Sequence, residues 1–157
     1  MKKAVYSMPV AYRYNPERKG APYTLDGARW LNAGELIEVQ VKGALGYEPR
    51  KDGNGRFDEC SDIPELNASV KSSKATLTTA RLGETFEEIL TSYFEKTVST
   101  MWIYGALIDD TLVTYTMNRD EFEEFMRKFS RLEANQNIIR IKWTSSKMLA
   151  WLDERAA

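Results

Sequence analysis

The amino-acid sequence predicts a mixed α/β domain in which helices flank a central mixed sheet. Two observations predict this class. Several segments repeat apolar residues with the spacing of an amphipathic helix, and others are runs of β-branched and aromatic residues broken by short polar turns. The chain has 157 residues, of which 43% are apolar and 29% charged. This length and composition indicate one globular domain spanning residues 1–157.

A first helix is expected over residues 26–45, with Gly46 as its stop. Its apolar residues fall near one helical face: Ala28, Leu31, Leu36, Val39 and Ala44. Residues 47–63 predict two short strands joined as a hairpin around Gly53 and Gly55. A turn then leads into a third strand, residues 68–77.

The second half of the chain continues with a helix over residues 85–100, for which Thr85 and Glu88 have the spacing of a capping box. Two apolar runs flank Asp109 and Asp110 and predict a β-hairpin. Asn118 opens a third helix. A last strand (138–143) and a short helix (146–154) complete a core order of α-β-β-β-α-β with an added hairpin and C-terminal helices.

The residue types in the sequence limit the catalytic groups and metal ligands that the protein can use. The sequence has no histidine, which excludes a histidine-based catalytic triad and typical zinc sites, and its one cysteine, Cys60, excludes an internal disulfide. Any metal must therefore be held by oxygen ligands, which favours Mg²⁺ or a similar hard ion. No segment is long and apolar enough to span a bilayer or has the pattern of a signal peptide, so we expect a cytoplasmic protein without membrane contact.

The strand over residues 68–77 carries polar residues where a core strand would carry branched or aromatic ones. Because side chains two apart share a face, Ser69, Lys71 and Ser73 are expected to align. A tight turn would bring Asp62 beside Lys71. A carboxylate with carbonyl and water oxygens can hold Mg²⁺, and a nearby lysine can orient water or stabilise charge on a phosphate.

Together with the order of elements over residues 26–117, this pattern resembles the PD-(D/E)XK nuclease superfamily. The resemblance implies a metal-dependent DNA endonuclease that uses Mg²⁺ or Mn²⁺. Asp62 matches the aspartate of the family's second core strand, and Lys71 matches the lysine of the third. Ser69 stands where the family usually has an acid, which puts the second metal ligand in doubt.

The resemblance also implies the remaining site residues. The metal would be held by Asp62, the carbonyl near Val70, Glu38 of the first helix, and Glu84 or Glu88 in place of the missing acid. Glu35 is the substitute for Glu38. Lys71, Asp62 and Glu38 are the expected catalytic residues. DNA, and a second copy of the chain, are the expected partners, and four basic residues are expected to contact DNA: Arg18, Lys19, Arg56 and Lys74.

Each of these residues also has a plainer interpretation. Asp62 can cap a turn, and Lys71 can be a solvated lysine that protects an edge strand. Glu35 and Glu38 can simply be exposed on a helix, and helix capping explains Glu84 and Glu88. Two alternatives to the nuclease hypothesis thus stay open: a nuclease-like fold that binds DNA without cutting it, and a protein-interaction module that uses aromatic residues such as Tyr12 and Trp30.

Overall fold

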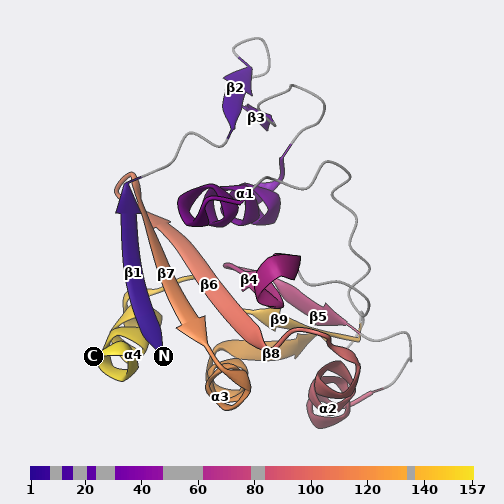
Figure 1. Ribbon diagram of the computed structural model, residues 1–157. Helices are drawn as coiled ribbons and strands as arrows, with labels where there is room; N and C mark the ends of the chain where they lie inside the picture. The colour runs from indigo at the N-terminus through magenta and orange to yellow at the C-terminus, as the bar shows by residue number, and fades with distance from the viewer. Residues whose placement is uncertain (8–11, 16–20, 24–30, 48–61, 79–83, 134–136) are drawn as a thin grey trace.

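The computed structural model describes residues 1–7, 12–15, 21–23, 31–47, 62–78, 84–133 and 137–157 (Figure 1). Within these residues the protein is mixed α/β, as predicted. The helices are α1 (Ala33–Leu45), α2 (Phe86–Lys96), α3 (Arg119–Phe129) and α4 (Ser146–Ala156). The strands are β1 (Lys2–Ser7), β2 (Arg13–Asn15), β3 (Ala21–Tyr23), β4 (Ala68–Lys71), β5 (Thr76–Thr78), β6 (Met101–Ile108), β7 (Thr111–Met117), β8 (Ser130–Glu133) and β9 (Ile138–Ile141).

The strands form a mixed four-stranded sheet, an antiparallel three-stranded sheet and a short hairpin of β2 and β3. The four-stranded sheet has the order β1-β7-β6-β4. Its strands pair antiparallel except for β4, which runs parallel to β6 with Ala68 opposite Met101. The smaller sheet has the order β5-β9-β8.

Helices cover both faces of the four-stranded sheet (Figure 1). On one face, Ile37 and Val41 of α1 pack against Ile103 and Leu112. On the other face, Trp102 and Tyr104 of β6 join the larger core, which also contains buried residues of α2, α3, α4, β5 and β9. The central sheet flanked by helices is therefore as the sequence predicts.

The ends of the helices follow the capping residues of the sequence. Thr85 and Glu88 form the predicted capping box of α2, and Asn118 forms one with Glu121 at α3. Asp109 and Asp110 form the predicted tight turn between β6 and β7. Gly46 ends α1 in the left-handed conformation, with φ of 82°.

Three predicted boundaries are wrong. The first helix does not begin at residue 26, because Asn32 caps its N-terminus in a capping box with Glu35. The single strand over residues 68–77 is two strands in different sheets, because Ala75 donates a backbone hydrogen bond to Ser72 in a turn where Lys74 has a positive φ of 62°. The helix expected over residues 85–100 ends at Lys96.

Other differences concern elements that the sequence pattern does not predict. β1 and β8 belong to this group. The hairpin expected around Gly53 and Gly55 lies outside the described residues. None of the helices among the described residues is long and apolar enough to cross a membrane.

Candidate functional site

Asp62 lies at the outer edge of β4. A 3-10 turn over Pro64–Leu66 and a left-handed Asn67, with φ of 49°, reverse the chain so that Ile63 pairs antiparallel with Ala68. One residue before this pair, Oδ2 of Asp62 accepts a hydrogen bond from the backbone N–H of Val70 at 2.7 Å. The turn therefore places two of the predicted metal ligands, Asp62 and Val70, next to each other.

The side chains of β4 alternate between the two faces of the sheet. Ala68 and Val70 pack in the cluster formed with α1. Ser69 faces the other way, where its hydroxyl lies 2.7 Å from that of Ser99. Lys71 shares this second face, and its Nζ lies 5.9 Å from the ring centroid of Tyr93 in α2. Ser73, expected in the same row, comes after the strand has ended and is no longer part of it.

Lys71 is buried, with 7% of its surface exposed. An ammonium group removed from water requires compensation from nearby groups, and the aromatic face of Tyr93 supplies part of it. The plainer interpretation of Lys71 as a solvated edge lysine is therefore wrong. Lys71 is thus buried against α2 at the end of β4, directly before the turn that carries Lys74.

Glu38 belongs to α1, on the opposite face of the sheet from Lys71. It forms an ion pair with Lys42 one helical turn away, at 3.1 Å. Lys42 is only 2% exposed, whereas the Glu38 side chain is 28% exposed. Glu35 reaches back to the N-cap of the same helix, where it accepts a hydrogen bond from the backbone N–H of Asn32. The structure therefore brings Asp62 and Val70 together, but it places the predicted catalytic residues Glu38 and Lys71 on opposite faces of the sheet.

Two buried polar residues of α1 were not among the predicted site residues. Gln40 is fully buried, and neither its amide oxygen nor its amide nitrogen has a hydrogen-bond partner in the described part of the chain. Lys42 is the other. In the sequence both alternate with valine in the segment VQVK, at positions 39–42. Polar residues within this apolar helical segment were the signal that could have identified them as buried polar groups.

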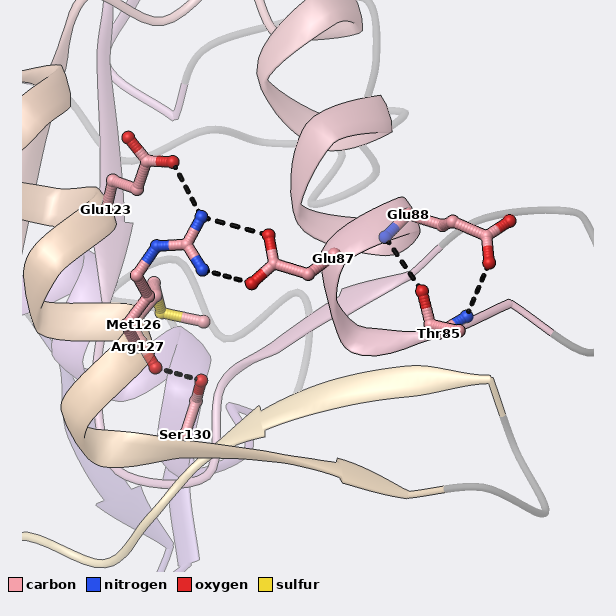
Figure 2. Close-up of polar contacts among 7 residues, drawn as sticks. All are labelled: Thr85, Glu87, Glu88, Glu123, Met126, Arg127 and Ser130. Carbon is pink, nitrogen blue, oxygen red and sulfur yellow. Dashed lines mark hydrogen bonds and ion pairs between the residues drawn. The ribbon is translucent and has the colours of Figure 1, made fainter.

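The two acids proposed as replacements for the missing ligand lie at the start of α2. Figure 2 shows Glu88 in the capping box with Thr85, whose backbone N–H lies 3.3 Å from the Glu88 carboxylate. Glu84 precedes the helix and is half-buried. The neighbouring Glu87 is paired with Arg127 of α3, which also binds Glu123 at 3.1 Å (Figure 2). Arg127 lowers the pKa of Glu87 chiefly through its hydrogen bonds.

Of the four basic residues expected to contact DNA, only Lys74 lies within the described residues. It is exposed, and its Nζ lies 4.4 Å from the ring centroid of Trp143. Arg18, Lys19 and Arg56 lie outside the described residues.

The described side chains include no group of three or more aspartate, glutamate or cysteine residues placed to hold a metal together. Mg²⁺ does not require such a group, because it usually keeps several waters and binds through one or two carboxylates. Asp62 with the Val70 carbonyl supplies oxygen ligands of the right kind. Of the three other predicted acids, Glu38 lies in α1, Glu88 lies in α2 and Glu84 precedes α2.

Comparison with models of protein families, with curated proteins and with solved structures found no match to this chain. The resemblance to PD-(D/E)XK nucleases is therefore still a prediction from the sequence.

Proposed function

We propose that this chain is a deoxyribonuclease that hydrolyses phosphodiester bonds with the help of Mg²⁺ or Mn²⁺. The observation that carries the proposal is the 2.7 Å hydrogen bond from the Val70 backbone to the Asp62 carboxylate. It holds a carboxylate at the edge of the same strand that carries the buried Lys71. A carboxylate beside the strand can bind a metal ion, and a lysine on the strand can stabilise charge on a phosphate, which are two tasks in metal-assisted phosphodiester hydrolysis.

Each residue has a defined task in this proposal. Asp62 and the carbonyl of Val70 bind the metal, and an acid from a helix completes the site. When bound, the metal lowers the pKa of a water molecule and neutralises charge on the phosphate. Lys71, held against Tyr93, orients the attacking water or stabilises the charge that develops on the phosphate oxygens.

Glu38 is the preferred helix acid because its partner is already a cation of the same helix. The Glu38 carboxylate forms an ion pair with Lys42 at 3.1 Å and is partly exposed. Glu88 is less suited, because its carboxylate already caps α2. Glu84, which lies just before the N-cap of α2, is the second choice among the acids.

A second candidate function is a nuclease-like fold that binds DNA without cutting it. The contact that favours it is the hydrogen bond between the hydroxyls of Ser69 and Ser99, at 2.7 Å. Ser69, one member of this buried hydroxyl pair, stands at the position where PD-(D/E)XK nucleases usually have an acid. In this case Lys71 would bind a phosphate without helping to break it.

Two further features belong to the proposal. We place the protein in the cytoplasm. A chain with one cysteine forms no internal disulfide and therefore needs no oxidising compartment. A homodimer would provide two sites for the two strands of a duplex.

The test is nicking of supercoiled plasmid by the purified protein with Mg²⁺, with Mn²⁺ and with EDTA. Asp62→Asn keeps an oxygen that can accept the Val70 hydrogen bond, and Lys71→Met keeps an unbranched chain against Tyr93. We expect both variants to fold normally and to lose at least about 100-fold in nicking rate. Lys2→Met, which removes an exposed lysine from the strand at the opposite edge of the sheet, is the matched control.

The proposal fails if the wild type nicks no DNA with either ion, or if Asp62→Asn or Lys71→Met cuts as fast as the wild type. DNA binding without nicking would support the second candidate.

A further inference from the structure

The three-stranded sheet has a polar outer face. Leu77, Ile139 and Ile141 point into the larger core, so the residues between them point outward. Arg131 of β8 lies directly opposite Arg140 of β9, and Arg140 lies opposite Thr76 of β5. The outer face therefore carries threonines of β5, Arg131 and Glu133 of β8, and Arg140 with the apolar Ile138 of β9.

Positive charge predominates on this face. Arg140 forms an ion pair with Glu133 at 2.7 Å and also donates a hydrogen bond to the carbonyl of Lys74 at 3.2 Å. The hydrogen bond from Arg140 is the main cause of the lowered pKa of Glu133, and the charges of Arg131 and Lys74 lower it further. Three cations thus surround one carboxylate, and the exposed Lys142 follows at the end of β9.

Trp143 stands at the edge of this face and is 66% exposed. The two other tryptophans among the described residues are buried, at 1% for Trp102 and 9% for Trp151. A single exposed apolar side chain is normal on a protein surface, so the indole points to a binding site only together with the groups around it. The ammonium of Lys74, 4.4 Å from the Trp143 ring centroid, places a cation directly beside the ring.

The segment that carries Trp143 is fixed by a network of hydroxyl groups. The backbone N–H of Thr144 donates to the Ser73 hydroxyl at 2.8 Å, and the Thr144 hydroxyl lies 2.6 Å from that of Tyr104. Ser73 belongs to the turn that presents Lys74, so the same contacts position the lysine and the indole. The site is therefore built into the fold and does not depend on two independent surface side chains.

We propose that Trp143, Lys74, Arg131 and Lys142 bind a single-stranded stretch of nucleic acid. An exposed aromatic ring offers a stacking surface to an unpaired base, and the cations around it offer contacts to the phosphates on either side. Bases inside a duplex are already stacked and cannot use the ring in this way. A protein partner is disfavoured because the apolar area of the indole is bordered by charged groups on the sheet.

This inference rests on the proposed function and deepens it, because it adds a surface that binds an unpaired stretch of the DNA substrate. The turn with Lys74 begins directly after Lys71, so a strand bound to Trp143 would lie next to the proposed catalytic residues. The surface binds nucleic acid whether or not the metal site is active, and the two proposals can therefore fail separately.

The experiment measures binding of a fluorescein-labelled oligodeoxythymidylate of about 15 nucleotides by fluorescence anisotropy. EDTA is present, so that no cleavage takes place, and the salt concentration is about 50 mM. We expect Trp143→Ala to weaken binding by about 5- to 150-fold, and Trp143→Phe, which keeps an aromatic ring, to weaken it less. Lys74→Gln should lower the slope of log K against log salt by about 0.7.

Two controls accompany these variants. Lys2→Gln removes an exposed lysine from β1, at the edge of the other sheet, and should bind like the wild type. A blunt duplex of the same length should bind more weakly than the single strand to the wild type, and the difference should shrink in Trp143→Ala. Circular dichroism and thermal unfolding confirm that each variant is folded.

The inference is overturned if the wild type does not bind the single strand, if Trp143→Ala binds it within twofold of the wild type, or if the duplex binds more tightly. If the wild type binds the single strand through Trp143 but nicks no DNA, only the proposed nuclease activity is overturned. If nicking depends on Asp62 but binding of the single strand does not depend on Trp143, only this inference is overturned.

Discussion

Tyr93 connects the larger core to the proposed site. Its hydroxyl accepts a hydrogen bond from the indole N–H of Trp102 at 2.8 Å, and both residues are buried. The ring of the same tyrosine lies 5.9 Å from the Lys71 ammonium. The hydroxyl therefore satisfies a buried donor of the core, while the ring helps to hold the lysine.

Replacing Tyr93 with phenylalanine separates these two tasks. Tyr93→Phe keeps the ring beside Lys71 but leaves the Trp102 N–H buried without a partner, which costs about 1 to 3 kcal/mol. We expect a loss of that size in the free energy of unfolding, measured by urea denaturation. Tyr6→Phe, at a half-buried tyrosine whose hydroxyl has no hydrogen bond within the described residues, is the control. Equal losses in both variants would show that the Trp102 contact contributes nothing.

The roles of residues that interact with near neighbours in the sequence, such as helix caps, were predictable from the sequence. Thr85 and Asn118 were identified because a capping residue followed three positions later by glutamate satisfies backbone groups within one turn. The exposure of Trp143 and the burial of Lys71 were not predictable, because exposure and burial depend on residues distant in the chain. In the apolar run from Ile138 to Trp143, nothing local shows that the strand ends at Ile141 and leaves the indole in water.

At the scale of elements, the position of α1 depends on Gly105 in β6. A Cβ added there would lie 2.7 Å from Cγ2 of Ile37 and 3.2 Å from Cγ2 of Val41. Both are methyl groups of β-branched side chains, which have little freedom to rotate away inside a helix. The absence of a side chain at residue 105 is therefore what allows the helix to pack close to the sheet.

We expect Gly105→Ala to lower the free energy of unfolding by about 1 to 3 kcal/mol, because the added methyl group overpacks this contact. Ile37→Ala removes the nearest methyl group and should recover part of that loss in the double variant. Urea denaturation of the four proteins gives the coupling energy directly. Strictly additive losses would contradict a close contact between residue 105 and α1.

The errors in predicting elements have physical causes. The segment from residue 68 to 77 was assigned to one strand because Lys74 adopts a left-handed conformation without being glycine or asparagine, the usual signals of such a turn. β8 was missed because it follows α3 without a connecting loop. The Ser130 hydroxyl donates to the Met126 carbonyl at this junction (Figure 2) and ends the helix without proline or glycine.

At the scale of the whole molecule, β4 and β5 are the link between two sheets. β4 extends the larger sheet, and β5 pairs with β9 in the smaller one, so the proposed catalytic strand and the proposed binding surface follow each other within a few residues. The sequence predicted the class and the central hairpin from local patterns. It did not predict the second sheet, since the pairing of β5 with β9 joins residues more than 60 positions apart.

The two ends of the described chain are also linked, through Asp153 of α4. Its carboxylate accepts hydrogen bonds at 2.7 Å from Lys3 of β1 and at 2.7 Å from the Tyr115 hydroxyl of β7. The hydrogen bond from Lys3, followed by that from Tyr115, lowers the pKa of Asp153 below its usual 3.8. Burial, and then the hydrogen bond to Asp153, raise the pKa of Tyr115.

This link predicts how stability depends on pH. A carboxyl whose pKa is lower in the folded state stabilises the fold above the unfolded pKa, and the contribution is lost as the pH falls through the folded pKa. Asp153→Asn should therefore be less stable than the wild type near neutral pH, by no more than about 1 kcal/mol because the carboxylate is half exposed. The difference should shrink as the pH falls from about 6 to about 3.

Urea denaturation of both proteins across this range measures the difference. Glu154→Gln, which removes an exposed carboxylate without an ion pair among the described residues, is the neighbouring control. Its difference from the wild type should stay nearly constant with pH. A constant difference for Asp153→Asn as well would mean that Lys3 and Tyr115 do not stabilise the ionised carboxylate, so that β1 and α4 are held together by apolar packing alone.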